Sequence, residues 1–174
     1  MKLYAVALIS ISFLAFISCN FVLNNSDELA TKNDIVNTFK DEAKFLVKAS
    51  KQNLDIIKLS KIIRKETNNK TIDQLTVKLE KSHLEILKAY NEIAEEKMIS
   101  IPNYSNLKLN NNDDIKENIP SHLNLIISKI NEQIDLLKHL NSNSKNLKEI
   151  TENIQSVLIN NRKQTESILK NLII

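Results

Sequence analysis

The amino-acid sequence predicts an all-α fold, in the form of an elongated antiparallel four-helix bundle. The 174 residues include no glycine and only two prolines, which argues against the tight turns, phosphate-binding loops and strand bulges that depend on glycine. Apolar residues recur at steps of three and four in four separate segments, which is the spacing of one buried helix face. Each segment covers roughly 20 to 30 residues, so helices of roughly 35 to 45 Å are expected. One such bundle accounts for the chain once a leader is set aside.

The chain starts with a segment typical of a secretion signal. Met1 and Lys2 supply a short positive start, and residues 3–17 form an apolar run shorter than the ~20 residues that span a membrane. We therefore expect residues 1–18 to be a signal peptide. The alternatives are an ordinary cleaved leader before an incidental cysteine, and an uncleaved anchor.

The only cysteine lies where this apolar run meets polar sequence. The stretch Ala15-Phe16-Ile17-Ser18-Cys19 resembles the lipobox of bacterial lipoproteins, although Phe16 departs from the usual leucine. The resemblance implies acylation of Cys19, for example by palmitate, and hence a membrane partner reached through a lipid anchor. Residues 19–32 are polar without a sustained period and are expected to form the lipidated tether of a bundle domain at residues 33–174.

The first helix is expected to begin at Asn33 or Asp34, because either side chain can cap free backbone N–H groups. Its pattern continues to about Lys65. The residues on its stripe are Ile35, Phe39, Ala43, Leu46, Ser50, Leu54 and Ile57.

The second helix is expected over about residues 72–97, after a polar break at residues 66–70. Thr71 is the expected N-cap, because Thr71 and Gln74 have the spacing of a capping box. The turn at Ile101-Pro102 closes the segment. His83 falls on its apolar stripe, with Glu80 three residues earlier on the same face. The apolar residues of the stripe are Ile72, Leu75, Leu79, Ile86, Tyr90 and Ile93.

A connection of nearly twenty residues follows, which is expected to cross an end of the bundle or to hold a short helix near residues 114–118. The third helix is expected from about Pro120, and the fourth over about residues 145–172. Asn161 and Thr165 interrupt the apolar stripe of the fourth helix. They face either a polar pocket or, as the favoured interpretation, a partly exposed end of the bundle. The third helix carries its stripe on Leu123, Ile127, Ile130, Ile134 and Leu137.

Charge and motifs exclude several function classes. Of 24 basic residues only Arg64 and Arg162 are arginine, so 24 − 2 = 22 are lysine, and they alternate with 21 acidic residues. This pattern is typical of a solvated helix surface, and we expect no nucleic-acid partner. The chain has no nucleophile motif, no paired histidines and no mature free thiol if Cys19 is acylated, so neither an enzyme nor a bound cofactor is predicted.

The stretch Asn53-Leu54-Asp55, the Ser82-His83 position and the Ile101-Pro102 turn belong to a distributed pattern over residues 41–102. This pattern resembles a bacterial envelope family of unknown function, often secreted or lipidated, with a ferritin-like four-helix bundle. The resemblance implies that fold, with an acidic residue at Asp55 and a histidine at His83. The second half departs from it, because asparagine stands at Asn131 and Asn160 where further histidines are usual, and His122 and His139 do not fall in the matching register. The residues that carry the pattern are Phe45, Leu46, Ala49, Asn53, Leu54, Asp55, Leu59, Ser82, His83, Leu87, Ile93, Ala94, Ile101 and Pro102.

His83 therefore has two interpretations. The preferred one is a buried histidine bonded to a neighbouring helix, and the other is a metal ligand together with Glu80 and Asp55. His122 and His139 are expected to face solvent. The corresponding function is a non-enzymatic, lipid-anchored bundle of the bacterial envelope, in the outer membrane, with a structural, stress-related or binding role and an unknown protein partner. The alternatives are a ferritin-like metal-binding bundle and a surface lipoprotein that binds host molecules.

Overall fold

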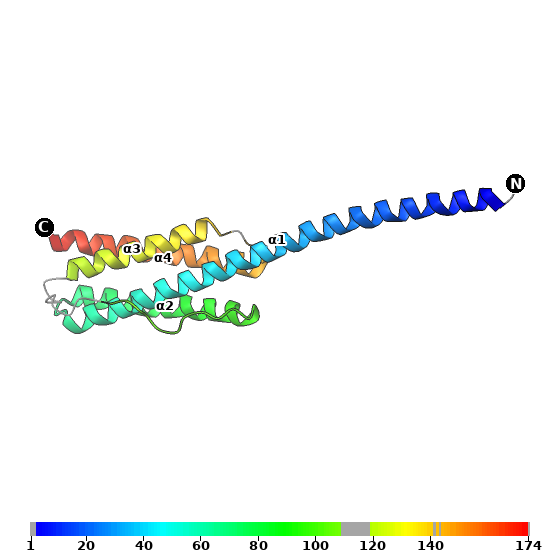
Figure 1. The fold of residues 1–174 in the computed structure, drawn as a ribbon. Helices are drawn as coiled ribbons and strands as arrows, with labels where there is room; N and C mark the ends of the chain where they lie inside the picture. The colour runs from blue at the N-terminus through cyan, green and yellow to red at the C-terminus, as the bar shows by residue number, and fades with distance from the viewer. Residues whose placement is uncertain (1–2, 109–118, 141, 143, 174) are drawn as a thin grey trace. The chain divides into compact units, whose positions relative to one another are not determined.

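The computed structural model describes residues 3–108, 119–140, 142 and 144–173, with side chains from Lys32 to Leu172 within these ranges. The described residues form an all-α structure of four helices without strands, as the sequence predicts (Figure 1). The chain divides into two compact units, Met1–Lys40 and Asp41–Ile174. The helices are α1 (Leu3–Glu66), α2 (Lys70–Glu96), α3 (Ile119–Lys138) and α4 (Lys145–Ile173).

Helix α1 begins far earlier than its expected cap at Asn33 or Asp34. Residues 19–32, expected to be an irregular tether, belong to the same helix. The physical reason is that no glycine or proline occurs between Leu3 and Glu66, so nothing in the backbone ends the helix. Among the described residues, no helix is long and apolar enough to cross a membrane.

The buried stripe of α1 also starts later than expected. Ile35 and Phe39, which the sequence places on that stripe, are 62% and 46% exposed. Both belong to the Met1–Lys40 unit, whereas the buried stripe starts within the Asp41–Ile174 unit, with Phe45 and Leu46 as its first apolar members. Periodicity continues through both units, but burial does not.

Helix α2 is capped by Asn69 and not by the expected Thr71. The Asn69 side-chain oxygen accepts the backbone N–H groups of Thr71, at 2.9 Å, and of Ile72, at 3.3 Å. Asn69 has extended backbone angles, which suit a capping residue. Since asparagine caps a helix at least as well as threonine, the earlier of the two candidates starts the helix, and Thr71 becomes part of its first turn.

The end of α2 shows how the chain turns without glycine. Met98 has a φ of 55°, the left-handed conformation that glycine usually adopts after a helix. Its N–H donates to the Glu95 carbonyl at 3.1 Å, and the Ile99 N–H donates to the Ala94 carbonyl at 2.7 Å. This pair of bonds is a Schellman motif, and it ends α2 five residues before the predicted Ile-Pro turn.

The segment after α2 returns along α1. Lys97 pairs with Glu42 of α1 at 2.8 Å. Further along α1, Asp55 accepts the Ser105 hydroxyl at 2.6 Å, and Lys58 donates to the Leu107 carbonyl at 2.7 Å. Sixteen positions separate Glu42 from Lys58, which is roughly 24 Å of helix. Figure 1 shows this segment as the green trace beside the helices. The short helix considered near residues 114–118 lies outside the described residues.

The core of the Asp41–Ile174 unit is one cluster to which all four helices contribute. In this cluster the rings of Phe45 and Tyr90 meet edge to face, with centroids 5.5 Å apart. Helix α4 packs against both α3 and α2. The fully buried large side chains are Leu46, Ile56, Leu59, Ile63, Leu79, Tyr90, Ile93, Leu123, Ile126, Ile130, Leu147 and Leu158.

Candidate functional site

Each of the four helices contributes an uncharged polar side chain to a buried layer. Asn53 from α1, His83 from α2, Gln133 from α3 and Asn161 from α4 are at most 1% exposed. Unpaired polar groups are costly in such a place. Asn53 bonds to both His83 and Gln133, whereas the Gln133 amide nitrogen has no hydrogen-bond partner. We refer to these four residues as the polar layer.

Hydrogen bonding in the polar layer specifies the state of His83. The Asn53 amide nitrogen donates to the Ala49 carbonyl at 2.9 Å and to Gln133 Oε1 at 3.0 Å, so Asn53 Oδ1 is an acceptor. His83 Nδ1 lies 2.6 Å from that oxygen and must carry the proton. The opposite ring nitrogen, Nε2, is then an acceptor that faces the Asn161 amide nitrogen at 3.5 Å.

His83 is neutral in this environment. Burial lowers the pKa of His83 from 6.5 to about 3, because the charged imidazolium would be desolvated. Both ring nitrogens already face protein partners. The expected burial of His83 is therefore confirmed, and its two ring nitrogens face Asn53 and Asn161.

The three candidate metal ligands have separate surroundings. Glu80 pairs with Arg64 at 2.8 Å and with Lys61 at 3.5 Å, both on α1. Asp55 accepts the Ser105 hydroxyl and lies 3.6 Å from Lys129. In the part of the chain with described coordinates, no group of three or more His, Cys, Asp and Glu residues is placed to hold a metal ion. A di-metal carboxylate centre needs several convergent acids and histidines. Glu80 and Asp55 instead have charged partners on α1 and α3 respectively.

Two predictions about polar residues are wrong. Asn161 and Thr165 do not mark an exposed end of the bundle, since they are 1% and 0% exposed. Asn161 donates to Ser82 Oγ at 2.8 Å, and Thr165 donates to the Asn161 carbonyl. His122 is buried rather than solvent-facing, because its position one turn into α3 already faces the core. His139 is exposed, as expected, and bonds to the Asp135 carbonyl through Nδ1.

An open cleft lies between α1 and α3. Its volume is about 580 Å³, within the range of small-ligand sites. We refer to it as the α1–α3 cleft. Its lining residues are Lys48, Lys51, Gln52, Asp55, Lys129, Glu132, Asp135, Leu136 and His139.

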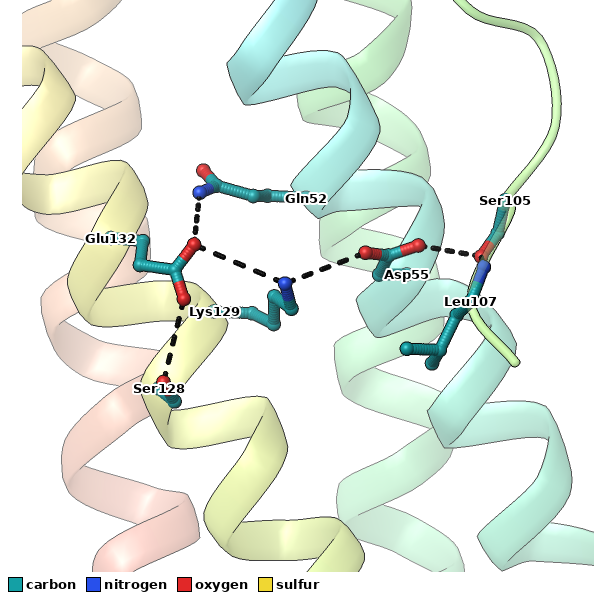
Figure 2. A network of polar contacts seen from close by, with 7 residues as sticks. All are labelled: Gln52, Asp55, Ser105, Leu107, Ser128, Lys129 and Glu132. Atoms are coloured by element: carbon teal, nitrogen blue, oxygen red, sulfur yellow. Dashed lines mark hydrogen bonds and ion pairs between the residues drawn. The ribbon is translucent and has the colours of Figure 1, made fainter. Parts of the chain in front are cut away.

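A charged network crosses the α1–α3 cleft, as Figure 2 shows. Lys129 lies between Asp55 Oδ2, at 3.6 Å, and Glu132 Oε2, at 3.9 Å. The Gln52 amide nitrogen reaches from α1 to Glu132 at 2.6 Å. Asp55 also holds the returning segment through Ser105, so the same carboxylate joins α1, α3 and that segment.

Sequence reasoning singled out Asp55 but missed Gln52 and Lys129 as its neighbours. Gln52 and Asp55 are three residues apart on α1, and Lys129 and Glu132 are three apart on α3, so each pair shares a helix face. The signal for a polar face was therefore present on both helices. The sequence did not show that these two faces pair, because their pairing depends on how α1 and α3 align across more than 70 residues of sequence.

Comparison with protein-family models, curated proteins and solved structures finds no match to this chain. The resemblance to a ferritin-like envelope family and the lipidation of Cys19 therefore stay predictions. The polar layer and the α1–α3 cleft supply the geometric basis for a function.

Proposed function

We propose that this protein is a non-enzymatic, lipid-anchored four-helix bundle of the bacterial cell envelope, in the outer membrane, and that it binds a ligand or partner at the α1–α3 cleft. One observation carries the binding role. The cleft is open and lined by charged side chains, whereas the His83 imidazole of the polar layer is fully buried and bonds to Asn53. Recognition at the surface is therefore favoured over chemistry in the interior.

The bundle arrangement that we propose is elongated, antiparallel and ferritin-like. Support comes from the order of contacts along α1. His83 of α2 contacts Asn53 of α1. Tyr90, further along α2, contacts Phe45, which is earlier on α1. Helix α3 shows the same reversed order. Lys129 contacts Asp55, whereas Glu132, further along α3, contacts Gln52, which is earlier on α1.

Helices α2 and α3 therefore run in the same direction, opposite to α1. Two consecutive helices with a shared direction need a long crossover connection, and the segment that returns along α1 supplies its first part. Ferritin-like bundles contain one such crossover.

The membrane attachment rests on the sequence around Cys19. In the envelope, an acylated Cys19 would hold the bundle at a periplasmic or surface-exposed membrane face. Each acyl methylene in the bilayer stabilises attachment by about 0.8 kcal/mol, so that two or more chains give firm anchoring.

Replacement of Cys19 is the test of this attachment. We express the protein without substitutions in a bacterium and expect it to enter the detergent phase on detergent–water partition. The Cys19→Ala variant is expected to move to the aqueous phase. Asn20→Ala, next to the modified residue, is the matched control and should stay in the detergent phase. Equal detergent partition of Cys19→Ala would refute lipid anchoring.

A further inference from the structure

We propose that the α1–α3 cleft binds a small zwitterion of the amino acid or short peptide class, with its carboxylate on the α1 side and its ammonium group on the α3 side. This inference rests on the proposed binding role and gives it a ligand class. It is carried by the charges on the two walls, by the groups that lack partners, and by the volume of the cleft.

The α1 wall offers cations without partners. Lys48 and Lys51 are exposed, and neither forms an ion pair within the described residues. They are three residues apart and share a helix face, where like charges repel each other. A ligand carboxylate between the two ammonium groups would replace that repulsion by charge-assisted hydrogen bonds.

The α3 wall offers acceptors. The Asp135 carboxylate is 64% exposed and pairs with Lys138 at 3.2 Å on the outer surface, an exposed pair that contributes little. The His139 ring lies on the same side, with Nδ1 bonded to the Asp135 carbonyl. A ligand ammonium group suits this side of the cleft.

Gln52, which also lines the cleft, has a buried acceptor without a partner. Gln52 is 9% exposed, and while its amide nitrogen bonds Glu132, its Oε1 atom has no hydrogen-bond partner. Figure 2 shows this amide extended from α1 toward α3. A ligand N–H that reaches Oε1 would satisfy a buried acceptor that is otherwise unpaired.

The charge balance separates a zwitterion from simpler ions. The lining contains three lysines, Lys48, Lys51 and Lys129, and three carboxylates, Asp55, Glu132 and Asp135. A site for a phosphate would need an excess of positive charge, and a site for a polyamine an excess of negative charge. Because the lining has equal numbers of positive and negative groups, a ligand that carries both charges is the best electrostatic match.

Calorimetric titration of the full chain in detergent micelles tests this inference. The probes are alanine, trialanine, N-acetyl-trialanine and trialanine amide, of which the last two each lack one terminal charge. We expect saturable binding of a zwitterionic probe, weakened by about tenfold when either terminus is blocked. Comparison of alanine with trialanine separates an amino acid site from a peptide site.

Exposed substitutions locate the two charges. Lys48→Gln combined with Lys51→Gln should remove the difference in binding affinity between trialanine and trialanine amide. Asp135→Asn should remove the difference in binding affinity between trialanine and N-acetyl-trialanine. Lys163→Gln, an exposed lysine of α4 away from the cleft, is the matched control and should bind normally.

Absence of saturable binding, or equal binding of blocked and free probes, would overturn the zwitterion assignment. Tighter binding of inorganic phosphate or of putrescine than of any zwitterion would do the same. These outcomes are distinguishable from failure of the anchoring proposal, because partition of the same protein into detergent is measured separately.

Discussion

Replacement of Asn53 by alanine is expected to lower the free energy of unfolding by about 2 to 4 kcal/mol. Asn53 is fully buried and bonds both His83 Nδ1 and Gln133 Oε1. Without it, the His83 N–H and the Gln133 carbonyl both lose a partner in the centre of the bundle, and a cavity replaces the amide. Urea unfolding followed by circular dichroism measures the loss.

Asn91→Ala is the matched control for this substitution. Asn91 is an exposed asparagine of α2, so its replacement should change the free energy of unfolding by less than about 0.5 kcal/mol. If Asn53→Ala changed the free energy of unfolding as little as Asn91→Ala, the polar layer would not stabilise the bundle in the way its geometry indicates.

Acid is expected to destabilise the protein through His83 well above the pH at which the folded histidine itself titrates. In the unfolded chain the pKa of His83 is near its ordinary 6.5, whereas in the folded chain burial lowers it to about 3. Between these values the unfolded chain binds a proton that the folded chain does not, so stability falls as the pH falls below 6.5. Each pH unit costs about 1.4 kcal/mol, and the loss by pH 5 is about 2 kcal/mol.

Comparison with His83→Gln isolates this contribution from that of other groups that titrate. We expect the difference in unfolding free energy between the unmodified protein and His83→Gln to depend on pH below 6.5 and to be constant above about pH 7.5. His139→Gln, which changes an exposed histidine, should keep the acid sensitivity of the unmodified protein. If His83→Gln lost as much free energy of unfolding in acid as the protein without substitutions, the effect would belong to other residues.

The sequence predicts the number of helices and most of their ends, because these depend on local patterns. The third and fourth helices begin within a residue of the expected positions, at Ile119 and Lys145. Local chemistry was less decisive at the start of α2, where Asn69 and Thr71 are both good capping residues two positions apart. Where two caps compete, the pattern alone does not choose between them.

Burial is predicted less well than helix content, for a physical reason. Ile35 and Phe39 have the same spacing as Leu46, yet they are exposed while Leu46 is fully buried. Periodicity reports which face of a helix is apolar. It does not report where along that helix the apolar face becomes buried.

The polar layer was only partly predictable from sequence. A histidine on an apolar stripe indicates a buried histidine, and His83 is one. Its partner Asn53 and the amides of Gln133 and Asn161 carry no charge and have no fixed spacing relative to His83. Their meeting depends on the register of four helices, which a single sequence does not contain. For the same reason Glu80 looked like a partner of His83 but pairs with Arg64 and Lys61 of the neighbouring helix.

The nitrogen NMR spectrum of His83 tests most directly whether the centre of the bundle is a structural layer and not a site of chemistry. We predict a proton on Nδ1 and none on Nε2, with signals that do not change between about pH 7 and pH 5 or on addition of Zn²⁺ or Fe²⁺. A ring that titrates in this range, or whose Nε2 signal shifts with metal, would contradict the account and place the chemistry of this protein at His83.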